Sequence, residues 1–273
     1  MISWDGYEFL QDKTIMELYC KHKNFMLLDF KKCLGYGKKI FDNYYIFVKL
    51  NFPKCSNVQL LTILNNVSKR AFSVRLLTNK QIMANTPFKR DYTMVIDLKK
   101  SENELWNNLK KKRRNEIRQG YRRGVKVTII DESRLEEWIN VYINTARRKG
   151  FSQLPRGLLL DLFDLKNTFF FAAIVDNKIA SVALIVNENN HLYWWVGGTD
   201  LKYQWYRPND VLHWEIIRWG LENQFEYYDM CGLVLNRGHG PTKFKLGYNG
   251  EIIPYYIYNI NKGIIGKIVN SII

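Results

Sequence analysis

Three short apolar segments follow one another between residues 169 and 198, and only brief polar turns separate them. The first two are joined by Asp176-Asn177, and the second and third by residues 188–190. Segments of this length and composition are typical of β-strands, and connections this short join antiparallel neighbours. The sequence therefore predicts an antiparallel meander that ends near Gly197-Gly198.

Helices and strands are predicted on both sides of the meander. Apolar periodicity indicates helices over residues 57–70, 132–149, 155–165 and 209–222, strands over residues 25–30, 44–50, 73–77, 92–97, 225–231 and 252–258, and a short helix or turn over residues 242–248. From residue 132 onward the predicted order is α-α-β-β-β-α-β-α-β, so the fold class is α+β (α/β mixed). We expect one domain over residues 1–98 and another over residues 99–259.

The last residues, 260–273, are predicted to form an amphipathic helix. Its apolar stripe has Lys262 and Lys267 beside it and consists of Ile264, Ile265, Ile268, Val269, Ile272 and Ile273. Such a stripe either packs on the body of the protein or touches a membrane surface.

Positive charge is concentrated in one segment. The chain has 41 Lys and Arg residues against 26 Asp and Glu residues, which gives a formal net charge of +15. Residues 110–126 hold nine basic residues and one acid, Glu116, and so carry +8 of that total. This balance favours an anionic partner such as nucleic acid, a phosphate-bearing substrate or an anionic membrane surface.

The basic segment belongs to a predicted helix. Ser101 and Glu104 form a capping box at its start, and Gly120 and Gly124 end it. Charged runs of this kind are either solvated faces or surfaces that follow a phosphate backbone. The candidates for phosphate or nucleic-acid contact are the outward-facing Lys110, Lys111, Arg114 and Arg118.

One arginine of this helix faces the apolar side. At 100° per residue, Arg113 falls within the arc that Leu105, Leu109 and Ile117 form. A buried arginine needs an acid or a phosphate as a partner. We therefore expect Arg113 to have either a structural carboxylate partner or a ligand contact.

Candidate substrate-binding residues surround the loop that follows the meander. A strand that ends at a glycine pair, and a loop that leads into a helix N-terminus, can together hold an acyl donor or a phosphate. Arg207 stands at the entrance of that helix and is a candidate for phosphate binding. The aromatic candidates, whose alternative role is core packing, are Trp194, Trp195, Tyr206 and Phe244.

Two ionisable residues are candidates for catalysis. Asp229 falls in an otherwise apolar strand, where an acid is either paired structurally or accepts a proton. Lys245 follows Phe244, and near a developing oxyanion its charge would stabilise the transition state. The alternative for Lys245 is an ordinary surface lysine.

Several other classes of protein are not expected. Four scattered cysteines without a CxxC pair argue against a disulfide framework and a zinc site, and the histidines form no metal-binding motif. No apolar run approaches the ~20 residues that span a bilayer, and the first ten residues lack the basic start of a signal peptide. We expect a soluble, cytoplasmic protein without a bound metal or cofactor.

Four stretches of the chain resemble the Fem-type (FemABX) aminoacyltransferases and their GNAT-fold relatives. They are residues 96–127, WWVGGTD at 194–200, YRPNDVLHWEIIRWG at 206–220, and YYDMCG with FKLGYNGE at 227–232 and 244–251. The order of elements over residues 132–259 also resembles the GNAT acyltransferase fold. The resemblance implies a complete GNAT domain preceded by a shortened GNAT-like domain.

The resemblance also implies an activity, the transfer of an amino acid from aminoacyl-tRNA to an amine of a cell-envelope precursor or amino sugar. In such an enzyme Lys245 matches the oxyanion-stabilising lysine and Arg207 a contact to a substrate phosphate. The chain departs from the relatives in its short first domain and its missing coiled-coil arm. Arg207-Pro-Asn-Asp-Val also replaces the acetyl-CoA signature of GNAT enzymes, and Pro208 lacks the N–H that a diphosphate would use.

Three functions follow as hypotheses. The first is amide formation with aminoacyl-tRNA as the donor, for which the +8 segment is suited. The second is an acyl-CoA-dependent N-acyltransferase that acts on an amino sugar or polysaccharide precursor, including a sugar nucleotide. The third is a non-catalytic nucleic-acid-binding module. In each case residues 264–273 could add peripheral contact with the inner face of a membrane.

Overall fold

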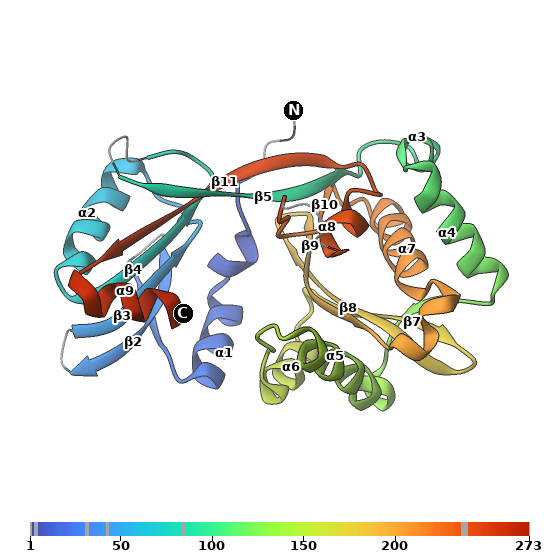
Figure 1. Cartoon of the computed structure of the whole chain (residues 1–273), viewed down its shortest axis with the longest axis horizontal. Coiled ribbons are helices and arrows are strands. Elements are labelled where there is room, and N and C mark those ends of the chain that lie inside the picture. The colour runs from blue at the N-terminus through green and yellow to red at the C-terminus, as the bar shows by residue number, and fades with distance from the viewer. Residues whose placement is uncertain are drawn as a thin grey trace. The chain divides into compact units, whose positions relative to one another are not determined.

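A computed structural model describes residues 2, 5–30, 33–41, 44–82, 86–235 and 240–272. Contacts between Cα atoms divide the chain into two units, one formed by Ser3–Tyr92 with Ile253–Ile273 and the other by Thr93–Ile252 (Figure 1). This division differs from the boundaries expected at residues 98 and 259. The chain passes from one unit to the other within β5 (Phe88–Asp97) and returns within β11 (Glu251–Asn261).

The first unit is a sheet with helices on both faces. Its elements are η1 (Glu8–Gln11), α1 (Lys13–Lys23), β1 (Met26–Asp29), β2 (Leu34–Phe41), β3 (Tyr44–Asn51), α2 (Asn57–Ser68), β4 (Ala71–Thr78), the first half of β5, β11 from residue 253 onward, and α9 (Gly263–Ile272). The strand order is β1-β2-β3-β4-β11, in which β3 and β4 are parallel and the other pairs are antiparallel.

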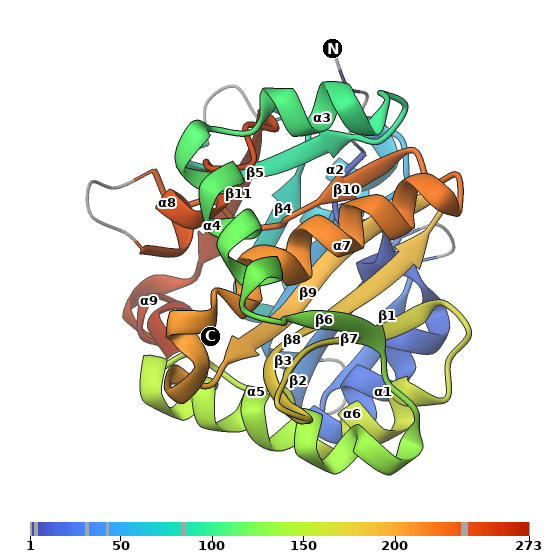
Figure 2. The ribbon, with the colours of Figure 1, turned by 90° about the vertical axis from the view of Figure 1, so that its right-hand side faces the viewer.

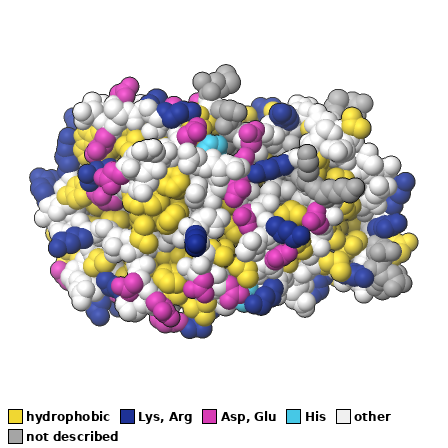
Figure 3. Space-filling model, turned by 180° about the vertical axis from the view of Figure 1, so that it is seen from behind, with side chains coloured by type: hydrophobic (Ala, Val, Ile, Leu, Met, Phe, Trp, Pro, Cys, Tyr) yellow, Lys and Arg dark blue, Asp and Glu magenta, His cyan; other side chains and the backbone are white. Residues whose placement is uncertain are grey.

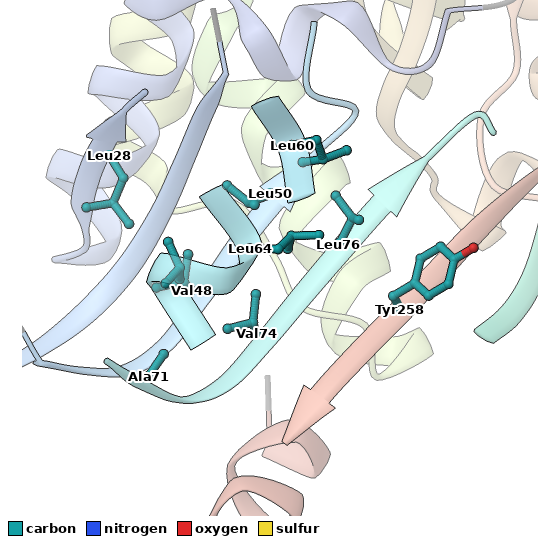
Figure 4. Packing of buried hydrophobic residues seen from close by; sticks show 10 residues of the cluster. Leu28, Val48, Leu50, Leu60, Leu64, Ala71, Val74, Leu76 and Tyr258 are labelled. Atoms are coloured by element: carbon teal, nitrogen blue, oxygen red, sulfur yellow. The ribbon is translucent and has the colours of Figure 1, made fainter. Parts of the chain in front are cut away.

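Alternation along the strands separates two cores in this unit. Val48, Leu50, Val74 and Leu76 point toward α2 and pack on Leu60 and Leu64 (Figure 4). Residues of the opposite parity, Tyr36 and Phe47, pack with Met16 and Cys20 of α1 and with Val269 of α9. Figure 1 shows α9 beside β4, in agreement with the contacts between them.

The second unit contains the predicted meander. Its elements are α3 (Glu102–Asn108), α4 (Lys111–Arg122), β6 (Lys126–Ile129), η2 (Glu132–Arg134), α5 (Leu135–Lys149), α6 (Arg156–Phe163), β7 (Thr168–Val175), β8 (Lys178–Glu188), β9 (His191–Thr199), η3 (Leu201–Tyr206), α7 (Pro208–Glu222), β10 (Tyr227–Asp229) and α8 (Gly240–Lys245), together with the second half of β5. The strand order is β5-β10-β9-β8-β7-β6. The antiparallel meander β7–β8–β9 is confirmed.

Helices cover both faces of this second sheet, as Figure 2 shows for α5 and α7. Phe170 of β7 packs against Trp138 of α5, with ring centroids 4.8 Å apart. Its neighbours Phe169 and Phe171 pack against Trp219 of α7, at 4.8 and 5.2 Å. Adjacent strand residues point to opposite faces, so these contacts place α5 and α7 on opposite sides of the sheet.

The prediction of a single helix starting at Ser101 is wrong, because the chain forms two helices there, α3 and α4. Lys110 N donates to Gly247 O at 3.0 Å, and both Leu109 and Lys110 are extended. The guanidinium of Arg114 donates to the carbonyls of Asn107, at 2.8 Å, and Leu109. These bonds satisfy carbonyls at the end of α3, so the helix stops before α4 begins.

Three smaller differences concern the rest of the chain. The elements α1, β2 and β6 were not predicted, and β10 is shorter than the predicted strand over residues 225–231. Cys33 and Cys55 form a disulfide, which the argument against a disulfide framework did not anticipate. Pairing of β2 with β3 brings the two cysteines together, since they flank these strands. In the described part of the chain, no helix is long and apolar enough to cross a membrane.

Candidate active site

The candidate site lies where β9 and β10 separate. These two strands are parallel and are connected through α7, so their carboxyl ends lie at the same edge of the sheet. Their pairing ends at Asp229↔Tyr193, and Cys231 then takes a left-handed conformation with φ of 55°. Strand β9 continues to Thr199 and has a bulge at Trp195, which has no partner in the register between β8 and β9. Ligands of α/β sheets bind at such carboxyl ends.

Lys245 reaches this point from the end of α8. Its Nζ donates to the carbonyls of Cys231 and Gly232, both at 2.7 Å, and only 9% of the residue is exposed. Burial lowers the pKa of Lys245 to about 8, and Cys231 and Asp229 oppose this shift. The side chain is therefore still largely a cation at pH 7. An ammonium group has three N–H donors, and the two carbonyls accept two of them, which leaves a third N–H.

Aromatic rings surround Lys245. Its Nζ lies 5.0 Å from the ring centroid of Trp194, and the Trp194 ring lies 6.4 Å from that of Phe244. His213 of α7 packs between them, 4.1 Å from Trp194 and 5.4 Å from Phe244. Three predicted site residues, Lys245, Trp194 and Phe244, thus come together.

His213 is a site residue that sequence reasoning missed. It is fully buried, and its Nδ1 shares a hydrogen bond of 2.6 Å with the hydroxyl of Tyr228. Burial, followed by the positive charges of Lys245 and Arg113, holds the pKa of His213 well below its usual value. The imidazole is therefore neutral and supports the aromatic surroundings of Lys245. The available signal was its place among apolar residues of a helix, which alone indicates only burial.

Asp229 supports the backbone that holds Lys245. Its Oδ1 accepts hydrogen bonds from the hydroxyl of Thr93 and from Cys231 N, the latter at 2.7 Å. The carboxylate thereby positions the turn whose carbonyls bind Lys245 Nζ. The structural pairing expected for this acid is present, and proton acceptance by Asp229 stays a prediction.

Arg207 and Tyr206 belong to a second group at the start of α7. Arg207 is the left-handed residue before Pro208, and its guanidinium lies 4.0 Å from Glu116. Tyr206 packs edge-on against Trp205, with centroids 5.3 Å apart. Contact of either residue with a substrate stays a prediction.

Arg113 connects this second group to the surroundings of Lys245. It is 6% exposed and forms ion pairs with Asp210 and, at 3.1 Å, with Glu116. Its guanidinium also lies 4.2 Å from the ring centroid of Phe244. A Cβ at Gly247 would lie 2.7 Å from Arg113 Nε, so glycine leaves the space that the arginine occupies. The expected carboxylate partner of Arg113 is confirmed.

The start of α7 fits a diphosphate poorly. Pro208 has no N–H, and the N–H groups of Asp210 and Val211 donate to Arg207 O at 3.2 and 3.4 Å. A diphosphate at this helix end would therefore meet few free N–H groups.

The four basic residues predicted to contact phosphate or nucleic acid divide into two kinds. Lys110, Lys111 and Arg118 are exposed, whereas Arg114 is half-buried and caps α3. The Arg118 guanidinium lies 5.2 Å from the ring centroid of Trp106. On the face shown in Figure 3, basic side chains occur together with acidic and hydrophobic ones. Nucleic-acid contact by these residues stays a prediction.

A comparison with protein families gives one match. The model described as "Acetyltransferase (GNAT) domain" matches residues 108–246, which is just over half of the chain and includes both groups of site residues. No curated protein sequence matches the chain significantly.

Solved structures resemble the chain over nearly its whole length. FemX shares 13% identity, with a TM-score of 0.71 and coverage of 99% of this chain and 96% of that one. The C-terminal domain (DUF2156) assigned to a lysylphosphatidylglycerol synthetase from Agrobacterium fabrum shares 11%, with a TM-score of 0.66 and coverage of 96% and 91%. L-PGS from Bacillus licheniformis shares 13%, with a TM-score of 0.65 and coverage of 96% of both chains. These likenesses show a mixed α/β, Fem-like fold of two domains.

Proposed function

Because this chain belongs to the acetyltransferase (GNAT) domain family and is an acyltransferase of that kind, we propose that it transfers an aminoacyl group from aminoacyl-tRNA to an amine. The acceptor would be a cell-envelope precursor or an amino sugar. The observation that carries this proposal is the geometry of Lys245, a buried cation held by two carbonyls at the carboxyl ends of β9 and β10.

The chemical step is the aminolysis of an ester. The acceptor amine attacks the ester carbonyl of the donor, and the third N–H of Lys245 stabilises the oxyanion that forms. A C–N bond forms, the C–O bond to the ribose breaks, and the leaving hydroxyl receives a proton while the amine loses one. Asp229 or solvent would accept the proton from the amine. Holding both substrates at this edge of the sheet supplies much of the rate.

Two observations favour aminoacyl-tRNA over acyl-CoA as the donor. The start of α7 offers few free N–H groups for the diphosphate of CoA. The exposed lysines and arginine of α4 would instead suit an RNA backbone. The fold shared with FemX and with L-PGS is consistent with this choice.

An assay of the two donors tests the proposal. The purified protein is supplied with an amino-sugar or peptide acceptor and with either a mixture of charged tRNAs or acetyl-CoA. We expect amide formation with charged tRNA, lost after RNase treatment, and none with acetyl-CoA. Activity with acetyl-CoA alone, unaffected by RNase, would overturn the tRNA proposal. Binding of RNA without transfer to any amine would favour the non-catalytic module.

The exposed face of α9 supports a proposal of peripheral membrane contact. Val269 packs on the protein, but Ile264, Ile265 and Ile268 are 77%, 57% and 55% exposed. Lys262 and Lys267 are exposed beside them and would attract anionic lipid head groups.

Flotation with liposomes measures this contact. We expect the protein to float with vesicles that contain phosphatidylglycerol and to float less with phosphatidylcholine alone. The variant Ile264→Ser/Ile265→Ser should lose most of the floating fraction, because it removes exposed apolar surface without disturbing the packed face. Ile252→Ser, which changes an exposed isoleucine elsewhere, is the matched control. Equal flotation of all three proteins would exclude α9 as the contact.

A further inference from the structure

An exposed tryptophan lies against the end of α4. Trp205 of η3 is 63% exposed, a larger fraction than that of any other aromatic residue in the described part of the chain. Exposure alone does not indicate a partner, because single apolar side chains are common on protein surfaces. The surroundings of this ring are what distinguish it, since they hold the ring in place and carry positive charge.

Arg123 fixes the orientation of the Trp205 ring. The guanidinium lies 3.7 Å from the ring centroid, and one of its terminal nitrogens donates to the backbone carbonyl of the same tryptophan. Tyr206 packs edge-on against the indole, with centroids 5.3 Å apart. No other ring or cation among the described residues packs on Trp205, so the face opposite Arg123 is open to solvent. A ring that is already oriented pays less conformational entropy when a ligand stacks on it.

The backbone beneath the ring is also held in place. Arg207, which ends η3, has a left-handed conformation with φ of 60°. A Cβ at Gly120 would lie 3.2 Å from Tyr206 O and 3.3 Å from Arg207 O, so glycine lets the end of α4 approach this turn closely. The position of Trp205 therefore follows from the packing of two helices and not from a free loop.

Positive charge surrounds the ring. The two segments that meet here, residues 122–126 and 201–207, contain no acid and five basic residues, which are Arg122, Arg123, Lys126, Lys202 and Arg207. The last of these lies 4.0 Å from Glu116, whereas the other four form no ion pair with any residue that the structure describes. Basic side chains around an aromatic ring are the combination that binds single-stranded nucleic acid, through the phosphates and through base stacking.

The position of Arg123 favours a nucleic acid over a lipid surface. An indole that entered a bilayer would have to take the stacked guanidinium with it or lose that contact, and a charge is costly to bury in lipid. A base can instead stack on the open face of Trp205 while the guanidinium stays in water.

We propose that Trp205, held by Arg123, is a stacking platform for an unpaired base of single-stranded RNA. The inference rests on the proposed function in its choice of RNA, because the unpaired end of an aminoacyl-tRNA donor offers such bases. It adds two residues, Trp205 and Arg123, to those expected to contact the donor. Its test measures binding without transfer, so it can fail or succeed separately from the donor assay.

Fluorescence anisotropy with two labelled probes separates stacking from charge. One probe is a short oligoadenylate, and the other is a ribose phosphate oligomer of the same length without bases. We expect the wild type to bind the oligoadenylate more tightly. Trp205→Leu should weaken that binding by roughly tenfold, the effect of one lost stacking contact, and should leave the base-free probe unaffected. Trp205→Tyr keeps an aromatic face and should retain most of the affinity.

Two further variants serve as controls. Leu201→Ala changes a 50% exposed side chain of the same helix and should bind both probes as the wild type does. Arg122→Met removes an exposed charge and should weaken both probes alike, with a salt dependence reduced by about 0.7 in the logarithmic slope. Thermal unfolding of each variant verifies that it is folded, which is expected because these side chains are exposed.

Several outcomes would overturn the proposal. They are equal binding of the two probes by the wild type, unchanged oligoadenylate affinity in folded Trp205→Leu, and a loss of vesicle flotation in Trp205→Leu without a loss of RNA binding. If charged tRNA supports transfer but RNA binding does not depend on Trp205, only the stacking platform is wrong. If RNA binding depends on Trp205 but charged tRNA supports no transfer, the platform stands and the proposed donor is wrong.

Discussion

Replacing Lys245 with alanine should lower kcat by about 10²- to 10³-fold, the usual effect of removing one oxyanion-stabilising donor. The effect should fall on kcat more than on KM, because the oxyanion exists only in the transition state. Lys243→Ala is the matched control, since Lys243 lies exposed on the same helix. Steady-state rates with the active donor, and thermal unfolding of each variant, provide the measurement.

The same lysine should shape the pH profile. Because burial lowers the pKa of Lys245 to about 8, its charge is present below that pH and is lost above it. The wild-type rate should therefore lose the contribution of Lys245 as the pH rises through about 8. The residual activity of Lys245→Ala should show no such loss. If the kcat of Lys245→Ala stays within threefold of the wild-type value, Lys245 does not have the proposed catalytic role.

Replacing Arg113 with methionine should destabilise the protein by about 3–5 kcal/mol, the cost of leaving a buried charge without its partner. Arg113 pairs with Asp210 and Glu116 and also donates to the carbonyl of Phe244 at 2.7 Å. For a unit of this size the loss corresponds to roughly 10 °C in the melting temperature. Circular dichroism during heating measures it.

Two further variants identify the cause of that loss. Arg122→Met removes an exposed arginine of the same helix and should change the melting temperature by less than about 2 °C. Arg113→Met/Asp210→Leu removes both charges of the buried pair and should recover part of the stability. A loss below about 1 kcal/mol for Arg113→Met, or no recovery in the double variant, would show that the ion pair does not support the fold.

Local sequence signals predicted the elements whose structure depends on near neighbours. The meander β7–β8–β9 was predicted because short polar turns can join only adjacent antiparallel strands. The burial of Arg113 was predicted from an arc that also included Leu105 and Leu109, but after the break between α3 and α4 only Ile117, one turn later in α4, supports it. Element β2 was missed because Gly35 and Gly37 interrupt its pattern and two lysines follow.

The candidate site was only partly predictable. Lys245 was identified by its resemblance to a family lysine, but its partners are backbone carbonyls, which carry no signature in the sequence. His213 was missed because a lone histidine in an apolar helix is most often a core residue. The break between α3 and α4 was missed because it depends on the side chain of Arg114. This side chain donates to carbonyls at the end of α3, and that contact forms only in the folded chain.

The sequence by itself determined the order of most elements, the concentration of charge in residues 110–126 and the inward position of one arginine. These features depend on residue type and on spacing over a few residues. Only the tertiary structure decided which distant residues meet, such as Lys245 with the turn after β10 and Arg113 with Asp210. The physical reason is that such contacts follow from strand register and from crossover connections, which bring together residues that have no local relation in the chain.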